Sequence, residues 1–152
     1  MNFDIKFDFQ RRDRLGLIEA IWGQDKSIDQ LERLSENVLS KNEVVFITRI
    51  NSEKANYLLD LYDDARFYEE ANCLTIGKNF NKIITNKKVA IISGGSSDLA
   101  VTLEAQLALE IYGVNCQSFI DVGVAGLHRL MSQLEEINKY DVLIVCAGME
   151  GA

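Results

Sequence analysis

The residues best suited to chemistry follow three short runs that we predict to be strands, of which the first and third are continuously apolar. The first run, residues 89–92, leads into Ser93-Gly94-Gly95-Ser96-Ser97-Asp98. Glycines let a backbone approach a ligand closely, and the first N–H groups of a following helix attract phosphate. We predict that Gly95, Ser96 and Ser97 bind phosphate and that Asp98 accepts a hydrogen bond from a ribose hydroxyl. The alternative is that this loop only connects a strand to a helix, with Ser97 or Asp98 as the cap.

The second run, residues 116–120, leads into Asp121-Val122-Gly123-Val124-Ala125-Gly126-Leu127-His128-Arg129. His128 is the only histidine of the chain, and an imidazole exchanges protons near neutral pH. We therefore predict catalytic roles for Asp121 and His128 and a substrate-binding role for Gly126. The alternative is a capping Asp121 and a histidine on the surface of a helix.

The third run, residues 142–146, leads into Ala147-Gly148-Met149-Glu150-Gly151-Ala152. Glu150 is a candidate for orienting a substrate or exchanging a proton, and Gly148 is a candidate for substrate binding. A solvated loop carboxylate is the competing interpretation of Glu150.

The elements between these loops predict how they are positioned. Helical patterns over residues 99–112 and 126–139 alternate with the three predicted strands, which is typical of βαβ units and a parallel sheet. The carboxyl ends of parallel strands meet at one edge, where open α/β sheets bind ligands. Such a sheet usually has about five strands, so we expect this chain to be an incomplete piece or to be completed by another chain.

Residues 1–80 form a separate small α/β domain in this interpretation, and the polar, Asn-rich residues 81–88 are a linker to a second domain at residues 89–152. Within the first domain we expect a strand at residues 3–9, a charged turn at 11–14, a helix capped by Ser27, a strand at 44–47, a helix capped by Ser52, and short strands near Phe67 and at 74–76.

Composition narrows the class of protein. The chain is 47% hydrophobic and 26% charged with a net charge of −7, which suits a soluble globular protein and argues against binding nucleic acid or an anionic membrane. No apolar stretch reaches the length of a membrane span, and no secretory signal is visible. The three widely spaced cysteines, Cys73, Cys116 and Cys146, predict reduced thiols and a cytoplasmic protein. We predict no metal-binding cluster from side chains.

The motifs at residues 121–129 and 147–152 resemble those of the LarB family, pyridinium-3,5-biscarboxylic acid mononucleotide synthases related to the purine-biosynthesis carboxylase PurE. The loop at residues 94–98 is similar to the family's phosphate loop. The resemblance extends to the amino-terminal half through Arg14, Gly16, Glu19, Gly23, Lys26, Thr48-Arg49 and Glu70-Ala71. Ile18 and Asp25 depart from the family's usual proline and glycine. The fold implied is a small α/β domain followed by the first three strands of a PurE-like, flavodoxin-like parallel three-layer sandwich.

The resemblance also implies an activity. Such enzymes carboxylate the pyridinium ring of nicotinic acid adenine dinucleotide at C5 with CO2 or bicarbonate and release AMP, in the biosynthesis of the nickel-pincer nucleotide of lactate racemase. Mg²⁺ is expected at the phosphates, and a homo-oligomer is expected of the full-length protein. The family's cysteine nucleophile belongs to a later part of its chain, and neither Cys116 nor Cys146 matches its motif. This chain is therefore expected to be inactive alone.

Two other functions remain open. One is a PurE-type carboxylase or mutase acting on aminoimidazole ribonucleotide, although the run from Asp121 to His128 replaces that family's Ser-Ala-His-Arg. The other is a non-catalytic nucleotide-binding or assembly module whose partner completes the sheet.

Overall fold

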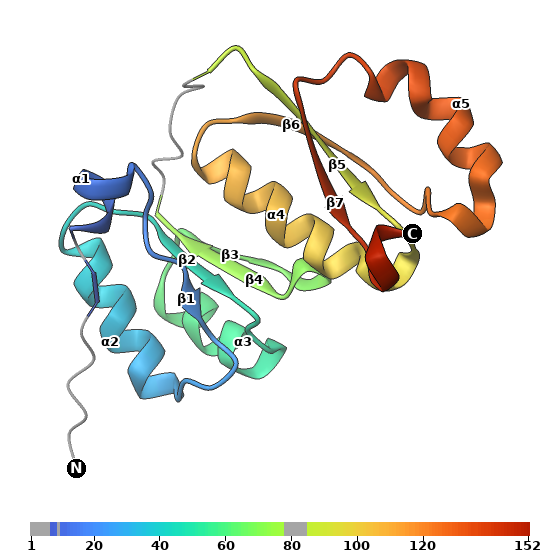
Figure 1. Ribbon diagram of the computed structural model, residues 1–152. Helices are drawn as coiled ribbons and strands as arrows, with labels where there is room; N and C mark the ends of the chain where they lie inside the picture. The colour runs from blue at the N-terminus through green and yellow to red at the C-terminus, as the bar shows by residue number, and fades with distance from the viewer. Residues whose placement is uncertain (1–6, 9, 78–84) are drawn as a thin grey trace. The chain divides into compact units, whose positions relative to one another are not determined.

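The computed structural model describes residues 7, 8, 10–77 and 85–152, which form a mixed α/β protein with parallel strands (Figure 1). The chain divides into two units, Met1–Asn79 and Phe80–Ala152. The strand expected at residues 3–9 and half of the expected linker lie outside the described residues, apart from Phe7 and Asp8, which are in no strand.

The first unit contains a four-stranded sheet in the order β1-β2-β4-β3. β1 (Ile21–Trp22) runs parallel to β2 (Val45–Thr48), whereas β4 (Cys73–Ile76) is antiparallel to both β2 and β3 (Ala65–Tyr68). Every residue of β2 and β4 is buried, so these two strands form the centre of the unit.

Two helices cover this sheet. α2 (Ile28–Leu39) begins at the predicted cap Ser27, whose hydroxyl accepts a hydrogen bond from the backbone N–H of Gln30 while the Gln30 side chain accepts from the backbone N–H of Ser27. α3 (Ser52–Leu61) is capped by Asn51, one residue before the predicted Ser52, because the Asn51 side-chain oxygen accepts from the N–H of Lys54. The apolar side of α2 joins a core made by Ile21, Leu31, Leu34, Val38, Val45, Ile47, Ile50, Ala55, Leu58, Leu74 and Ile76.

The charged run at residues 11–14 is part of a short helix, α1 (Arg11–Leu15), and the expectation of a turn there was wrong. Arg14 pairs with Asp8, and the backbone N–H of Asp8 donates to Glu19 at 2.7 Å. These contacts hold the segment that precedes α1. A local pattern of charges in the sequence does not reveal them. A 3₁₀ turn, η1 (Glu69–Ala71), connects β3 to β4.

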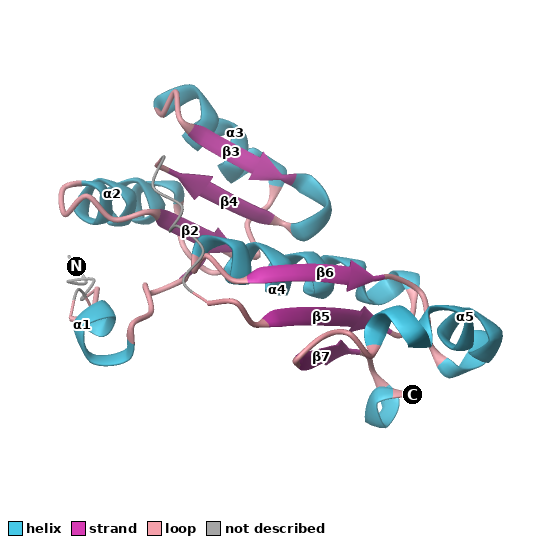
Figure 2. Ribbon diagram, turned by 90° about the horizontal axis from the view of Figure 1, so that it is seen from above, coloured by secondary structure: helices cyan, strands magenta, loops and turns pink. Residues whose placement is uncertain are grey.

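The second unit has the predicted parallel sheet, with β5 (Lys88–Ser93) in the centre, β6 (Asn115–Phe119) on one side and β7 (Val142–Cys146) on the other. Figure 2 shows the three strands pointing in one direction. The two helices between them, α4 (Leu99–Ile111) and α5 (Leu127–Ile137), confirm the expected βαβ alternation.

Both faces of β5 are buried. Ala90 and Ile92 lie in a cluster with Phe119 of β6 and with Leu130 and Ile137 of α5. Side chains of a strand alternate between its faces, so Val89 and Ile91 point the other way, where α4 contacts β5 and β6. β7 differs, because Val142, Leu143 and Val145 are 48%, 52% and 55% exposed. Across the described residues, no helix has the length and apolar character needed to cross a bilayer.

Candidate active site at the carboxyl edge of the parallel sheet

The three predicted loops meet around Gly94, directly after β5. The N–H of Gly94 donates to the carbonyl of Cys146 at the end of β7, at 3.1 Å. The carbonyl of Gly94 accepts from the N–H of Gly123, in the loop after β6, at 2.8 Å. Backbone hydrogen bonds therefore join segments that are separated by more than 20 residues in sequence.

Glycine is required at two of these positions by close approach of the backbones. A Cβ on Gly123 would overlap the carbonyl oxygen of Gly94 and lie 2.9 Å from its carbonyl carbon. A Cβ on Gly94 would lie 2.9 Å from the Cβ of Ala147. Neither glycine has a positive φ, so the constraint is one of space.

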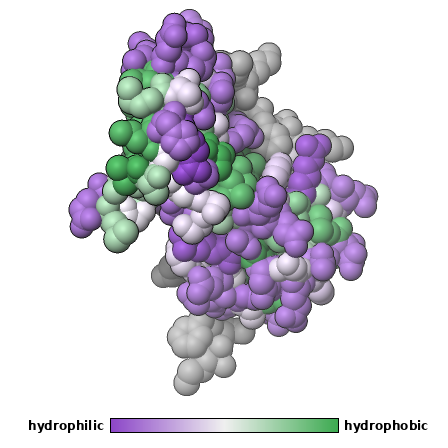
Figure 3. Space-filling view, turned by 90° about the vertical axis from the view of Figure 1, so that its right-hand side faces the viewer, coloured by the Kyte–Doolittle hydropathy of each residue, from purple (hydrophilic) through white to green (hydrophobic). Residues whose placement is uncertain are grey.

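A cavity of about 270 Å³ opens between the loops, and we call it the carboxyl-edge cleft. Its surroundings include exposed apolar side chains, with Val124, Leu127 and Met149 at 63%, 54% and 84% exposure. Figure 3 shows apolar residues gathered at the surface on the side where α5 and the C terminus lie in Figure 1. The cleft is lined by Ile92, Ser93, Gly94, Val122, Gly123, Val124, Leu127, Leu130, Val145, Ala147, Gly151 and Ala152.

The loop after β5 is held in place by its own polar side chains. The buried Ser93 hydroxyl accepts a hydrogen bond from the N–H of Asp121 at 2.9 Å. The Asp98 carboxylate accepts a hydrogen bond from the N–H of Gly95 at 2.9 Å. Asp98 thus has a structural role within the loop, and the ribose contact predicted for it stays a prediction. Ser96 and Ser97 are exposed in the 3₁₀ turn η2 (Ser96–Asp98) that leads into α4. Their backbone N–H groups lie at the start of the helix, where N–H groups have no carbonyl acceptor within the helix.

The loop after β6 contains an ion pair that the sequence did not suggest. Asp121 adopts the left-handed conformation, with φ of 58°, and its carboxylate pairs with the guanidinium of Arg129. The guanidinium folds against Gly126 of the turn η3 (Val124–Gly126), where a Cβ would overlap it. The Arg129 Nε is buried and has no hydrogen-bond partner among the described residues. Arg129 is a candidate functional residue that the sequence reasoning left out, and its only sequence signal was an arginine next to His128.

None of the predicted site residues lines the cleft itself, although each neighbours a lining residue or lies in a loop that contributes one. His128 is exposed in the first turn of α5, between the lining residues Leu127 and Leu130. Glu150 is exposed in the turn η4 (Met149–Gly151), next to the lining residue Gly151, with φ of 60°. Gly148 has open space on its Cβ side. The roles predicted for His128, Glu150 and Gly148 remain predictions.

The resemblance implies a magnesium ion at the substrate phosphates, and this expectation stays a prediction. The described residues contain no group of three or more His, Cys, Asp or Glu side chains arranged to hold a metal ion. Two carboxylates in the loops of the cleft have partners, since Asp98 accepts from a backbone N–H and Asp121 pairs with Arg129.

The thiol of Cys116 is poorly placed for nucleophilic chemistry. Burial raises the pKa of Cys116, and the carboxylate of Glu110 raises it further, so the thiolate is disfavoured at neutral pH. Cys116 also pairs with Val89, at the amino end of the sheet. Cys146 ends β7 and is buried.

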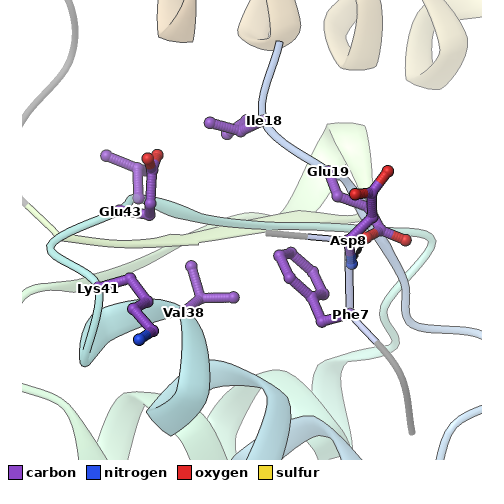
Figure 4. A pocket seen from close by; sticks show the side chains of 8 residues that line it. Phe7, Asp8, Ile18, Glu19, Val38, Lys41 and Glu43 are labelled. Atoms are coloured by element: carbon purple, nitrogen blue, oxygen red, sulfur yellow. Dashed lines mark hydrogen bonds between the residues drawn. The ribbon is translucent and has the colours of Figure 1, made fainter. Parts of the chain in front are cut away.

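The first unit has a cavity of about 100 Å³, shown in Figure 4. Phe7, Ile18 and Val38 provide its apolar part, while Asp8 and Glu19 lie together on one side. Both carboxylates have structural partners, since Asp8 pairs with Arg14 and Glu19 accepts from the backbone of Asp8. These polar groups therefore secure the amino-terminal segment, and we do not treat this cavity as a catalytic site.

Comparison with known proteins agrees with these observations. Residues 3–78 match the family model described as the LarB/PurE-like N-terminal domain. An uncharacterized protein from Methanocaldococcus jannaschii is 35% identical over 156 residues, an alignment that covers 97% of this chain and 60% of that protein. The chain thus spans less than two thirds of the length of this relative. Because the family model matches half of the residues, the chain belongs to the family of proteins with a LarB/PurE-like N-terminal domain.

Proposed function

We propose that this chain provides the dinucleotide-binding part of a carboxylase–hydrolase that acts in nickel-pincer nucleotide biosynthesis. The substrate is nicotinic acid adenine dinucleotide, the pyridinium ring is carboxylated at C5 by CO2 or bicarbonate, and hydrolysis of the phosphoanhydride releases AMP. Membership of a LarB/PurE-related family, which is a carboxylase-related one, supports the reaction class. The single observation that carries the assignment of the site is the convergence of three loops on Gly94.

The cleft and the loops beside it together offer the features that a charged ring attached to sugar phosphates needs. Apolar side chains such as Val124 and Leu127 offer a surface for a planar ring, as in most small-molecule sites. The N–H groups of Ser96 and Ser97 at the helix start suit a phosphate. The Arg129 guanidinium, oriented by Asp121, suits a substrate carboxylate because its planar fork can form two parallel hydrogen bonds.

The residues of this chain bind and orient the substrate in this proposal, and they do not supply the nucleophile. The raised pKa of Cys116 and its place at the amino end of the sheet argue against a role for its thiolate. We therefore propose that the 152 residues bind the dinucleotide without turnover and that the complete protein carries out the reaction.

Calorimetry of this chain with two ligands tests the substrate class. We expect nicotinic acid adenine dinucleotide to bind more tightly than aminoimidazole ribonucleotide. The opposite order would favour a purine carboxylase, and binding of neither ligand would contradict a nucleotide site in the cleft.

Two variants of Asp98 separate its two roles in the same assay. Asp98→Ala removes the acceptor of the Gly95 N–H and should weaken dinucleotide binding, because the phosphate loop loses its internal hydrogen bond. Asp98→Asn keeps an oxygen acceptor and should preserve more of the affinity. Unchanged affinity in Asp98→Ala would exclude the loop from the site.

Release of AMP tests the reaction. The complete protein should release AMP from the dinucleotide in the presence of bicarbonate, and this chain alone should not. Carboxylation by this chain alone would contradict the division of roles. If the complete protein does not release AMP, the hypothesis of a non-catalytic nucleotide-binding or assembly module is favoured over the enzyme.

A further inference from the structure

An exposed tryptophan and an arginine form a stacked pair at the ends of β1 and β2, in the first unit. The guanidinium carbon of Arg49 lies 4.9 Å from the centre of the Trp22 ring. Trp22 is 45% exposed and ends β1, while Arg49 directly follows β2. β1 and β2 are parallel, so both residues lie at the carboxyl edge of this pair of strands.

The backbone of Arg49 is held in a conformation that its residue type disfavours. Its φ of 53° lies in the left-handed region, which glycine and asparagine adopt most readily. The other described left-handed positions of the first unit are indeed Gly16, Asn42, Asn72 and Gly77. In the second unit, Asp121, Met149 and Glu150 share this conformation, and all three lie in the loops of the carboxyl-edge cleft. Strained residues of this kind concentrate at binding sites, and Arg49 marks the corresponding edge of the first unit.

The surroundings fix this strained conformation. Thr48 and Ile50, on either side of Arg49, are 7% and 1% exposed, and the N–H of Ile50 donates to the carbonyl of Asn72 at 2.9 Å. Gly23 closes the other side, because a Cβ there would lie 3.0 Å from the carbonyl oxygen of Thr48. The backbone that carries the Arg49 side chain beside Trp22 is therefore held in place by buried neighbours.

A lysine also anchors the loop that follows Trp22. The ammonium group of Lys54, in α3, donates to the carbonyls of Gly23 and Gln24 at 3.0 and 2.8 Å. This contact ties the connection between β1 and α2 to the first turn of α3. It also brings a second cation to the same edge of a protein whose net charge is −7.

We propose that Trp22 and Arg49 form a second nucleotide-binding site, which takes a purine nucleoside monophosphate. A purine base stacks on the exposed indole or on the outer face of the guanidinium, and both surfaces are planar. The guanidinium N–H groups lie in the plane of the fork and bind the phosphate oxygens. This site stands on the first unit alone and does not rest on the function proposed for the carboxyl-edge cleft.

The platform of Trp22 and Arg49 contains its own reporter, because Trp22 is the only tryptophan of the chain. Titration with AMP, excited at the red edge of the tryptophan absorption, should quench the emission in a saturable way. Adenosine, which lacks the phosphate, should bind more weakly, and ribose 5-phosphate, which lacks the base, should leave the emission unchanged. If the emission of Trp22 instead falls as the protein concentration is raised in the absence of nucleotide, the platform contacts a second copy of the chain. That result would overturn the proposal.

Arg49→Gly is the decisive variant, because glycine adopts a positive φ without strain and the fold should persist. Its affinity for AMP, measured by the quenching of Trp22, should fall by about tenfold or more, as expected when a charge-assisted hydrogen bond is lost. Asn72→Gly is the matched control, since it places a glycine at the neighbouring left-handed position and keeps the cation. Gly123→Ala, which disturbs the carboxyl-edge cleft, should leave the quenching by AMP intact. Unchanged affinity in Arg49→Gly, or loss of quenching in Gly123→Ala, would overturn the proposal.

Discussion

At the scale of single residues, two glycines allow a controlled test of the carboxyl-edge cleft. Gly123→Ala forces a Cβ against the carbonyl of Gly94, whereas Gly148→Ala adds a Cβ into open space. Neither position has a positive φ, so the two variants differ in steric cost alone. We predict that Gly123→Ala lowers the free energy of unfolding by about 1–3 kcal/mol and weakens dinucleotide binding. Urea denaturation checks this, and equal stability of the two variants would contradict the packing of the loops.

The thiol of Cys116 gives a second prediction at this scale. Burial, followed by the charge of Glu110, raises its pKa, so the reactive thiolate is scarce at neutral pH. Iodoacetamide should modify Cys116 more slowly in the folded protein than in urea, with mass spectrometry of the Cys116 peptide as the readout. Equal rates in the two conditions would show that the thiol is accessible and activated.

At the scale of elements, the amino edge of the parallel sheet carries an ion pair with a defined pH dependence. Asp141 accepts hydrogen bonds from Lys87 Nζ at 2.8 Å and from the N–H of Lys88 at 2.9 Å, and these lower the pKa of its carboxyl below the ordinary 3.8. A carboxyl whose pKa is lowered by folding stabilises the fold above its unfolded pKa. That stabilisation is lost as the pH falls below about 3.8 toward the lower folded value.

Asp141→Asn should therefore reduce stability at neutral pH and flatten the loss of stability in acid. The side chains are largely exposed, so the effect should be small. Thermal unfolding between pH 7 and about pH 3 provides the measurement. An identical acid profile in the variant and the parent would show that the pair does not contribute. The variant also serves as a binding control, because it lies at the opposite end of β7 from the cleft.

Elements with strong periodicity or a complete cap were predictable from the sequence. The strand at residues 142–146 and the helix after Ser27 agree with the structure, because an unbroken apolar run and a capping box are local signals. α1 was missed because the contacts that hold its start, between Arg14, Asp8 and Glu19, are set by the fold. The meeting of the three loops followed from strand direction alone. The pairing of Arg129 with Asp121 did not, because it depends on how one loop turns back on itself.

At the scale of the whole molecule, the chain forms two units, and their separation is open to a direct test. The polar residues 81–88 are predicted to be a linker, and they contain lysines at 82, 87 and 88. Trypsin should cut first within this segment and leave two fragments that resist further digestion. A first cut within α2, after Arg33, would contradict the predicted boundaries, and mass spectrometry of the early products distinguishes the cases.

Residues with a strained backbone and exposed apolar side chains both occur at or near the carboxyl ends of the parallel strands. Left-handed residues other than glycine and asparagine follow β2, β6 and β7 at the carboxyl ends of parallel strands. The apolar side chains of β7 are also half exposed, although a central strand of a covered sheet would bury them. This surface suits contact with further protein, and the homo-oligomer expected of the full-length protein stays a prediction.

Hydrogen–deuterium exchange of the chain with and without nicotinic acid adenine dinucleotide tests the central claim most directly. If the three loops form one site, the ligand should slow exchange in residues 93–98, 121–126 and 147–152 together. The amino edge of the sheet, around Lys88, Asn115 and Asp141, should exchange at the same rate in both states. Protection of a single loop, or protection centred on the amino edge, would contradict the account.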